Sequence, residues 1–386
     1  MAGLHGWSRA LVAEDSAPKT APGGRWRAAI LGHTGEGDYG HGLDLIFNDR
    51  PDVELVAIAD PDAAGRAKAA ERCKVSRAYA DWRELLEKEK PQLVCLASRW
   101  THERYPAALA ALDMGAHLVS EKPFTQTLAE ADELIGLADR KGAKIAVAHQ
   151  MRLAPSIDAL RQAITGGLIG DLLEIHAWGK QDARAGGEDM IVLGSHMFDL
   201  MRLFAGDPAW CSASVLAGGR DITRQSARSV KEQIGPVAGD EISAQFGFAQ
   251  GVLGSFTSRK RRREQVGHWG LELVGSKTSA RVLADVFPAV YVLRPGKWDA
   301  AGRVDQWHRL EHDPGARLRA DERGFGPANQ RLVDDWLAAV REGREPVCSG
   351  RNAMKAIEMI MAVYQAALSG TRATFPLVVR THPLEG

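Results

Sequence analysis

Residues 27–42 read RAAILGHTGEGDYGHG, and this stretch decides the fold. A short apolar strand over 27–31 runs into a loop in which Gly35, Gly37 and Gly40 match the pattern G-x-G-x-x-G. A helical stretch over 43–48 and a second apolar strand over 55–60 follow, and Asp60 lies 20 residues beyond Gly40. Glycines let the backbone approach a pyrophosphate, whose charge is stabilised at the start of a helix. The order of strand, glycine-rich loop, helix, strand and terminal acid predicts a dinucleotide-binding unit.

The glycine-rich loop departs from the usual pattern. The strand ends at Gly32, which leaves three extra residues before Gly35, and an alternative alignment starts at Gly32 with Thr34 in place of the second glycine. We expect the cofactor to contact Asp60 and the loop residues Gly32, His33, Thr34, Gly35, Gly37 and Gly40. The Asp60 carboxylate would bind the ribose diol and repel a 2′-phosphate, which favours NAD over NADP. The alternative is a vestigial loop that binds no cofactor.

The following residues repeat the same α/β alternation. Helices are predicted at 61–73, 81–88, 103–114 and 127–140, and strands at 92–97, 117–120 and 144–148. Thr127 and Glu130 form a capping-box pattern at the start of the last of these helices. Strands separated by helices indicate a parallel, doubly wound sheet. We therefore predict a Rossmann domain over 26–149, preceded by a flexible tail over 1–25.

Composition limits the remaining classes of function. The chain has 386 residues, enough for two domains. Lys plus Arg equals Asp plus Glu at 49 each, so no net field favours nucleic acid or a membrane. The four cysteines are far apart and form no CxxC pair, which argues against a zinc site and fits a reducing compartment. No apolar run approaches the roughly 18 residues of a membrane span, and the first residues lack a secretory signal pattern. We expect a cytoplasmic protein without a metal ion.

Residues 118–124 read LVSEKPF and place a charged pair at the end of a strand. Pro123 cannot continue the strand and holds Lys122 in extended backbone at its tip. Ligands of open parallel sheets bind outside the carboxyl ends of the strands. Lys122, with Glu121 beside it, could position a substrate hydroxyl or carry its proton. The alternative is a solvated Glu–Lys pair.

These motifs carry a family resemblance. The segments SRWTH (98–102) and ALDMGAHLVSEKPF (111–124) resemble the glucose–fructose oxidoreductase / inositol dehydrogenase / rhizopine catabolism (Gfo/Idh/MocA) family. The resemblance covers residues 26–380. It implies a Rossmann domain followed by an α+β domain with an open, mostly antiparallel sheet. The implied activity is hydride transfer between a nicotinamide and a sugar, polyol or related alcohol.

The resemblance also assigns residues of the first domain. Lys122 would lie beside the nicotinamide and the reacting carbon as a catalytic residue. Ser98, Arg99, His102 and Glu121 would contact the cofactor. His102 matches the family's histidine, whereas Arg99-Trp100 departs from its more usual small-residue or proline pattern.

The second half, 150–386, reads independently as α+β. Helices are predicted at 155–164, 188–204, 329–341 and 353–368, and strands at 172–178, 212–216, 240–248, 252–258, 271–275, 281–283 and 290–293. Strands that follow one another without helices indicate antiparallel pairing. We expect this domain to bind substrate and to mediate assembly, with the last helices packing back on the Rossmann domain. The resemblance implies a homo-oligomer.

Residues 194–199 read GSHMFD and resemble the family's Gly-x-His-x-x-Asp, which implies that His196 is the catalytic acid/base. A histidine suits this role because its ordinary pKa lies near neutrality. The alternative is a core histidine. The family usually has an aspartate one turn earlier, where this chain has Val192; Asp189 lies on the same helix face and could contact another part of the substrate. Asp199 could orient the His196 ring or anchor the helix.

Further candidates lie at the ends of the strands predicted at 144–148 and 172–178. We expect Gln150, Arg152, Trp178 and Lys180 to bind substrate, although Arg152 could instead bridge the domains and Trp178 could belong to the core. The basic run 259–263 is interpreted as a solvated hairpin end or an intersubunit patch rather than a nucleic-acid site. The polar segment 217–239 is long enough to form a lid or an oligomer arm.

The sequence thus predicts an NAD(H)-dependent oxidoreductase acting on a carbohydrate or polyol. One alternative is an NAD-dependent glycosidase that works by transient oxidation and elimination. A second is a non-catalytic, NAD-binding regulatory protein on the same fold.

Overall fold

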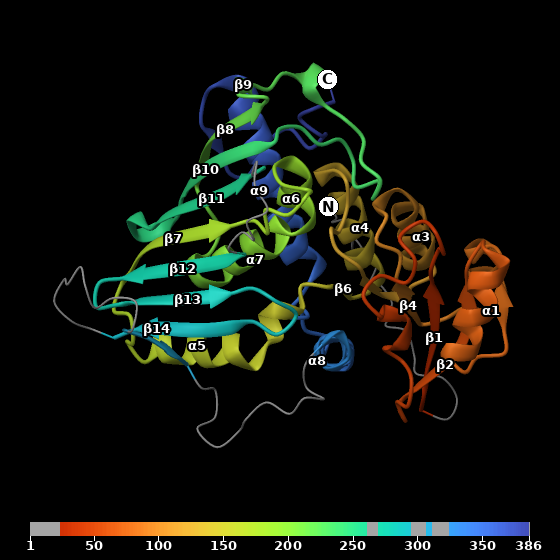
Figure 1. Cartoon of the computed structure of the whole chain (residues 1–386). Coiled ribbons are helices and arrows are strands. Elements are labelled where there is room, and N and C mark those ends of the chain that lie inside the picture. Colours follow the sequence, from red (N-terminus) through yellow and green to blue (C-terminus); the bar gives the residue numbers. More distant parts are fainter. Residues whose placement is uncertain (1–23, 261–268, 295–305, 311–323, 386) are drawn as a thin grey trace, which may run out of the picture.

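The N-terminal half of the chain is built on a six-stranded parallel sheet. The computed structural model describes residues 24–260, 269–294, 306–310 and 324–385. The strands lie in the order β3-β2-β1-β4-β5-β6 (Figure 1). Their bounds are Trp26–Leu31 (β1), Val53–Ala59 (β2), Ala78–Tyr79 (β3), Leu93–Leu96 (β4), His117–Ser120 (β5) and Ile145–Val147 (β6). The strand order reverses between β1 and β4, which is where open α/β sheets bind their ligands.

Four helices alternate with these strands. They are α1 (Ala63–Arg72), α2 (Trp82–Glu89), α3 (Thr101–Asp113) and α4 (Leu128–Lys141). The predicted capping box at the start of α4 is confirmed, since the Thr127 hydroxyl accepts from the Glu130 amide and the Glu130 carboxylate accepts from the Thr127 amide. The helix predicted over 43–48 is wrong, because only a single 3₁₀ turn, η1 (Leu43–Leu45), follows the glycine-rich loop.

The C-terminal half contains a ten-stranded sheet with the path β15-β14-β13-β12-β7-β11-β10-β8-β16, and β9 pairs with β8. Its strands are Leu172–Trp178 (β7), Trp210–Ala217 (β8), Arg220–Asp221 (β9), Glu241–Gly247 (β10), Leu253–Arg259 (β11), Gly270–Gly275 (β12), Ser279–Leu283 (β13), Ala289–Leu293 (β14), Trp307–Arg309 (β15) and Ala373–Thr374 (β16). All neighbours are antiparallel except β7 and β11, which are parallel. The predicted fold, a Rossmann domain with an α+β domain on a mostly antiparallel sheet, is confirmed.

Helices cover one face of this second sheet (Figure 1). They are α5 (Pro155–Thr165), α6 (Gly187–Val192), α7 (Gly194–Ala205) and α9 (Gly350–Ser369). The other elements of this half are α8 (Phe325–Glu342), which packs on the parallel sheet, and the 3₁₀ turns η2 (Gln150–Leu153), η3 (Arg224–Ser226) and η4 (Ala249–Gly251). The single helix predicted over 188–204 is wrong, because the chain breaks at Leu193 and forms α6 and α7. The Ser349 cap predicted for α9 is confirmed: its hydroxyl accepts from the Asn352 amide at 3.2 Å.

The last long helices contact the Rossmann half. Leu332, Val333 and Trp336 of α8 are wholly buried in one cluster with residues of β1, β4 and η1. The Trp336 indole donates to the Lys144 carbonyl at 3.2 Å. Because the loop after β1 forms only a 3₁₀ turn, α8 supplies apolar cover on this face of the parallel sheet. No helix in the described part of the chain is long and apolar enough to cross a membrane.

Candidate active site

Lys122 lies directly beyond the end of β5 and is buried, with 6% of its surface exposed. Its Nζ donates to the main-chain oxygen of Val192, at the end of α6, at 2.9 Å. Burial lowers the pKa of the Lys122 ammonium, and the negative charge of Glu121 opposes this effect. The lysine expected at the strand tip therefore points into the junction between the two halves.

Glu121 is wholly buried and holds the loop on the other side of Lys122. Its Oε1 accepts from the His41 amide at 2.9 Å and lies 2.8 Å from the His41 Nδ1. Burial alone would raise the carboxyl pKa, but the His41 hydrogen bond and the charges of His41 and Lys122 lower it to about 2. Gly40 allows this approach: it has φ +60, and a Cβ there would meet Glu121 and lie 2.7 Å from the Ala97 oxygen. The carboxylate thus anchors the loop rather than facing solvent.

The His196 side chain extends from α7 into the space that Lys122 also borders, and 7% of its surface is exposed. Its ring centre lies 5.3 Å from that of His149 and 6.1 Å from that of Trp269. Its Nδ1 is buried without a hydrogen-bond partner among the described residues. Burial, followed by the charges of His149 and Lys122, lowers the His196 pKa well below its usual range. The ring is therefore neutral near pH 7 and able to accept a proton.

The polar groups behind His196 form a separate network. Asp199 accepts from the Arg152 Nε with both carboxylate oxygens at 2.8 Å, and its Oδ1 lies 3.8 Å from the His149 Nδ1. Asp199 thus pairs with Arg152 and His149, and among the described residues it forms no hydrogen bond or ion pair with the His196 ring. Arg152 joins η2 to α7 through this pair, which fits the bridging alternative; its role in binding substrate stays a prediction. The sequence analysis did not single out His149. No pattern in the residues around it indicates that its buried ring would pack beside that of His196.

The Asp189 carboxylate is also occupied by hydrogen bonds within the protein. It is wholly buried and accepts from the amides of Lys180 and Gln181 at 3.1 and 3.0 Å, and from the Ser258 hydroxyl at 2.5 Å. The break at Leu193 separates α6 from α7, so the single helix face assumed for Asp189 and His196 does not exist. Asp189 fastens the chain leaving β7 and does not line the cavity described below.

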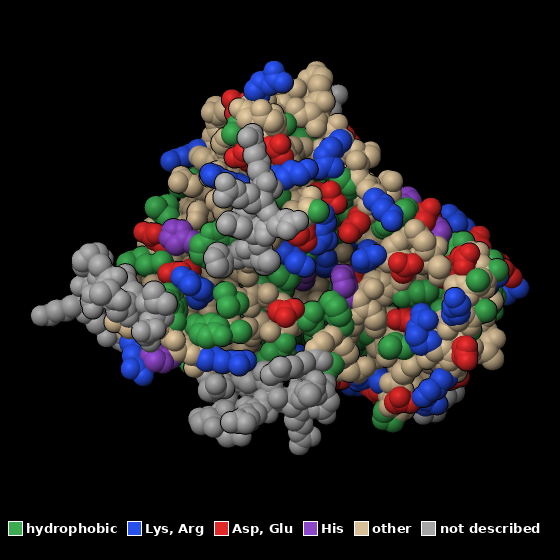
Figure 2. All heavy atoms as spheres, viewed as in Figure 1, with side chains coloured by type: hydrophobic (Ala, Val, Ile, Leu, Met, Phe, Trp, Pro, Cys, Tyr) green, Lys and Arg blue, Asp and Glu red, His purple; other side chains and the backbone are tan. Residues whose placement is uncertain are grey.

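A cavity of about 280 Å³ lies where these elements meet. Six of the predicted site residues line it: Arg99, Glu121, Lys122, Gln150, Lys180 and His196. Arg152, Trp178 and Asp189 do not. The space-filling view shows histidine and Lys/Arg side chains gathered where the two halves of the molecule meet (Figure 2). The structure therefore brings the two predicted catalytic groups to one cavity.

Residues that the sequence analysis did not single out complete the lining. Trp269 lies in the cavity, where an aromatic face was expected from Trp178. The Trp269 Nε1 is buried and has no hydrogen-bond partner among the described residues. The Lys180 Nζ lies 5.8 Å from the centre of the Trp269 ring. Glu232 comes from the segment 217–239, and the neighbouring Gln233 oxygen accepts from the Thr101 hydroxyl at 2.8 Å. This segment thus crosses to the Rossmann half and borders the cavity. Within the basic run 259–263, residues 261–263 lie outside the described residues, as does most of the predicted tail.

The glycine-rich loop folds back against the end of β4. Gly37 has φ +86, and a Cβ there would lie 2.6 Å from the Arg99 amide and from the Ser98 Oγ. The Ser98 hydroxyl donates to the Glu36 carbonyl at 2.7 Å. Gly35, with φ +87, has no atom within 4 Å of such a position and leaves the backbone open on that side. The Arg99 Nε, which is buried without a partner among the described residues, lies beside the cavity. The same guanidinium forms a long ion pair with Asp38, at 3.8 Å between its terminal nitrogen and the Asp38 Oδ2. An open backbone and a guanidinium with an unsatisfied Nε fit an anionic dinucleotide.

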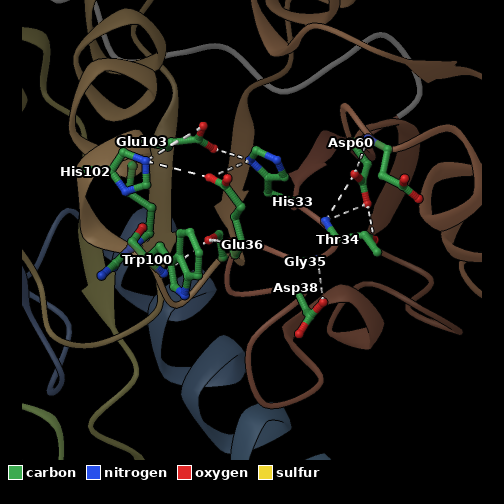
Figure 3. A network of polar contacts seen from close by, with 12 residues as sticks. His33, Thr34, Gly35, Glu36, Asp38, Asp60, Trp100, His102 and Glu103 are labelled. Carbon is green, nitrogen blue, oxygen red and sulfur yellow. Dashed lines mark hydrogen bonds and ion pairs between the residues drawn. The ribbon is translucent and has the colours of Figure 1, made fainter. Parts of the chain in front are cut away.

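Asp60, expected at the ribose, is wholly buried and already bonded (Figure 3). It accepts from the Thr34 amide and hydroxyl at 3.1 and 2.6 Å, from the Tyr39 hydroxyl at 2.8 Å and from the Asp62 amide at 2.9 Å. A ribose hydroxyl can reach this carboxylate only if one of these donors moves. The role of Asp60 in binding the ribose stays a prediction.

Two family descriptions match this chain. Residues 27–149 match the Gfo/Idh/MocA "Oxidoreductase family, NAD-binding Rossmann fold", and residues 167–375 match the family's "C-terminal alpha/beta domain". The chain belongs to the Gfo/Idh/MocA oxidoreductase family. It is thus an NAD-binding oxidoreductase, as the glycine-rich loop and the Glu-Lys-Pro strand end predicted.

Within the Gfo/Idh/MocA family, several relatives act on sugars. The chain is 25% identical over 365 residues to D-apiose dehydrogenase of Paraburkholderia graminis, covering 90% of this chain and 88% of that protein. It is 29% identical over 197 residues to D-glucoside 3-dehydrogenase of Escherichia coli, covering 47% of this chain and 55% of that protein. The structure of levoglucosan dehydrogenase in complex with NADH and levoglucosan has the same fold, with a TM-score of 0.75 at 19% identity, covering 92% of this chain and 100% of that one.

Proposed function

We propose that this Gfo/Idh/MocA protein transfers hydride between NAD(H) and a hydroxyl-bearing carbon of a sugar or polyol. The observation that carries the proposal is that Lys122 and His196, from different halves of the chain, line the same cavity of about 280 Å³. An aromatic face, Trp269, lies in the same cavity, and such faces pack on the C–H surfaces of sugars. The sugar dehydrogenases among its relatives support this substrate class.

The residues would act in a defined order. The Lys122 ammonium, when released from the Val192 carbonyl, donates a hydrogen bond to the substrate hydroxyl and places it in the cavity. The neutral His196 accepts the hydroxyl proton, because its lowered pKa keeps the imidazole unprotonated at neutral pH. Bound NAD⁺ supplies the hydride acceptor. In the reverse direction the same histidine returns the proton to the carbonyl oxygen.

The cofactor contacts are part of the same proposal. Arg99, beside the open backbone at Gly35, would bind the dinucleotide through charge, and Ser98 would hold the loop against β4. Gln150 donates to the Asn329 side chain at 2.8 Å and borders the same space. We assign Gln150 and Lys180 to the substrate, and Arg152, Trp178 and Asp189 to the architecture around it.

The test is a substrate screen with NAD⁺ and a panel of sugars, polyols and sugar acids, read as NADH absorbance. Net NADH formation with one class of free sugar supports the proposal. Release of an aglycone without net NADH would instead indicate an NAD-dependent glycosidase. Binding of NAD without turnover of any panel member, unaltered by Lys122→Ala, would indicate a regulatory protein.

We further propose that the protein is a cytoplasmic homo-oligomer. The four cysteines are free and buried, which suits a reducing compartment. Leu253 and Leu283 are 53% and 38% exposed on the sheet face that the helices leave uncovered. Light scattering after size exclusion tests the assembly: the wild type should exceed the mass of one chain, and Leu253→Glu with Leu283→Glu should lower it.

A further inference from the structure

Two histidines and two glutamates converge outside the cavity (Figure 3). His33 and Glu36 belong to the glycine-rich loop, and His102 and Glu103 belong to the first turn of α3. The two pairs are separated by more than 60 residues in sequence, as the 70-residue spacing of His33 and Glu103 shows. The fold alone brings them together, at a place where a loop meets a helix.

The spacing of His33, Glu36 and Glu103 suits a shared ion, because each offers one ligand atom and these atoms all lie within 4.8 Å of one another. The His33 Nδ1 contacts the Glu103 Oε2 and lies 3.9 Å from the Glu36 Oε2. The His102 Nε2 lies 3.8 Å from the Glu36 Oε2 and 4.0 Å from the Glu103 Oε1. These last three separations are too long for hydrogen bonds. Two ligands of one metal ion, each about 2.0–2.2 Å from it, lie about 3–4 Å apart, so a single ion can contact both sides of each gap.

The charges of the cluster also call for a cation. In the ranges that the structure describes, Glu36 and Glu103 form ion pairs with histidine alone, and no lysine or arginine joins them. With neutral imidazoles the cluster carries two negative charges within a few ångströms. Like charges at this distance repel one another. A divalent ion would neutralise both carboxylates and use the imidazole nitrogens as ligands.

The backbone that carries the cluster is held independently of any ion. The His33 and Asp38 main chains exchange hydrogen bonds of 3.1 and 2.8 Å across the loop. The Ser98 hydroxyl donates to the Glu36 carbonyl at 2.7 Å, and the Arg99 amide donates to the Gly37 carbonyl at 3.3 Å. The four side chains are between 17% and 41% exposed, so an ion can enter from solvent without opening the fold.

We propose that His33, Glu36 and Glu103 bind one divalent transition-metal ion of the zinc class, and that the neighbouring, half-exposed His102 turns toward it as a fourth ligand. Two imidazole nitrogens and two carboxylates suit Zn²⁺ and its neighbours better than Mg²⁺ or Ca²⁺, which prefer oxygen ligands alone. The ion fastens the glycine-rich loop to α3. The expectation of no metal, drawn from the scattered cysteines, considered only cysteine ligands. This proposal does not rest on the sugar dehydrogenase activity.

The test measures metal binding directly. Untagged full-length protein is stripped with a chelator, freed of it, and titrated calorimetrically with Zn²⁺ alone, without cofactor or sugar. We expect one equivalent of Zn²⁺ per chain and a higher melting temperature with the ion present. Glu36→Gln and His102→Asn should each weaken binding by about 10-fold or more. Co²⁺ should give the strong visible absorption of a four-coordinate ion.

The matched controls come from an exposed histidine–glutamate pair elsewhere. On β7 the His176 Nε2 lies 2.8 Å from the Glu174 Oε2, without a second pair beside it. Glu174→Gln and His176→Asn should leave the Zn²⁺ affinity unchanged. Absence of stoichiometric binding by the wild type would overturn the proposal, as would equal binding by Glu36→Gln and His102→Asn. If either variant fails to fold without metal, the stoichiometry and the Co²⁺ spectrum of the wild type decide. NAD titrations are scored separately, so failure of the proposed activity leaves this result intact.

Discussion

The Nζ of Lys122 donates a hydrogen bond to the main-chain oxygen of Val192 at 2.9 Å. This contact joins the end of β5, in the parallel sheet, to the end of α6, in the second half. Val192 stands where the family usually has an aspartate, so its side chain offers Lys122 no carboxylate. Burial lowers the Lys122 pKa, and the charges of Glu121 and Glu232 oppose it. The lysine and His196 remain as the pair that we propose to face the substrate.

Replacement of Lys122 by methionine should remove most of the activity and keep the fold. Methionine fills the buried volume without the ammonium that holds the hydroxyl. We expect kcat/KM to fall by about 10²- to 10⁴-fold, with the NAD dissociation constant changed much less. Steady-state kinetics and NAD binding by fluorescence measure both. Lys88→Met, on the surface of α2, should leave both unchanged, and a Lys122→Met enzyme with normal turnover would contradict the assigned role.

The pH dependence of sugar oxidation should reflect the protonation of His196 and Lys122, both of which are buried. Burial and the nearby charges of His149 and Lys122 lower the His196 pKa below its ordinary 6.5, and burial lowers the Lys122 pKa below its ordinary 10.5. The reaction needs a neutral imidazole and a charged amine. We therefore expect kcat/KM to decline on the acid side only below pH 6.5 and on the alkaline side already below pH 10.5. His149→Asn removes a neighbouring charge and should shift the acid limb upward; an acid limb above 6.5 in the wild type speaks against His196 as the base.

Trp269 and Trp178 offer a matched pair for the substrate site. Trp269→Phe keeps an aromatic face in the cavity and removes the unpaired indole N–H. Loss of one neutral hydrogen bond, about 0.5–1.5 kcal/mol, should raise KM about 2- to 12-fold with little change in kcat. Trp178→Phe, outside the cavity, should change neither constant. If Trp178→Phe raised KM and Trp269→Phe did not, steady-state kinetics would indicate that Trp178 packs on the substrate.

Stability should fall as the solution becomes acidic, because several histidines are buried. Burial, then the nearby charge of Lys144, lowers the His117 pKa from 6.5 to about 4, and burial lowers that of His382 from 6.5 to about 4. Between pH 6.5 and about pH 4 the unfolded chain binds protons that the folded chain excludes. The free energy of unfolding is therefore highest above pH 6.5 and decreases as the pH falls toward about 4. Urea denaturation at about pH 7 and about pH 5 measures the decline. His117→Asn keeps an acceptor for the Lys144 amide, bonded at 2.9 Å to the His117 Nδ1, and should show a shallower decline; an equal slope would exclude His117.

Tyr39 should compete with the cofactor for Asp60. Its hydroxyl donates to the Asp60 Oδ2 at 2.8 Å, in a wholly buried carboxylate. Tyr39→Phe should free this acceptor for a ribose hydroxyl and strengthen NAD binding, while the lost bond lowers the free energy of unfolding by about 1 kcal/mol. Calorimetric titration with NAD and NADP measures the affinities. Tyr79→Phe on β3, which removes a 2.6 Å bond to Glu89 at the end of α2, is the control. Unchanged NAD affinity would mean that the ribose binds away from Asp60.

Local patterns in the sequence were sufficient for most strands, for most helices and for the ends of β2 and β5, but they missed the short strands β3, β9, β15 and β16. Hydrophobic runs and their spacing report burial directly, so the parallel sheet could be read without coordinates. Asp60 and Lys122 could be placed at strand ends because a terminal acid and a proline mark those ends within a few residues. The helix predicted after the glycine-rich loop was wrong: Leu43, Ile46 and Phe47 pack with α8, almost 300 residues later, and only 43–45 form a 3₁₀ turn.

Contacts between distant segments were decided only by the tertiary structure. The sequence indicated Trp178 and Asp189 from their places near a strand end, but side-chain direction and the break at Leu193 turned both away from the cavity and brought Trp269 in. His149 and the cluster of His33, Glu36, His102 and Glu103 have no local signature, because each group is assembled from segments that meet only after folding. Periodicity encodes which face of an element is buried; which partners meet on that face depends on the packing of the whole chain.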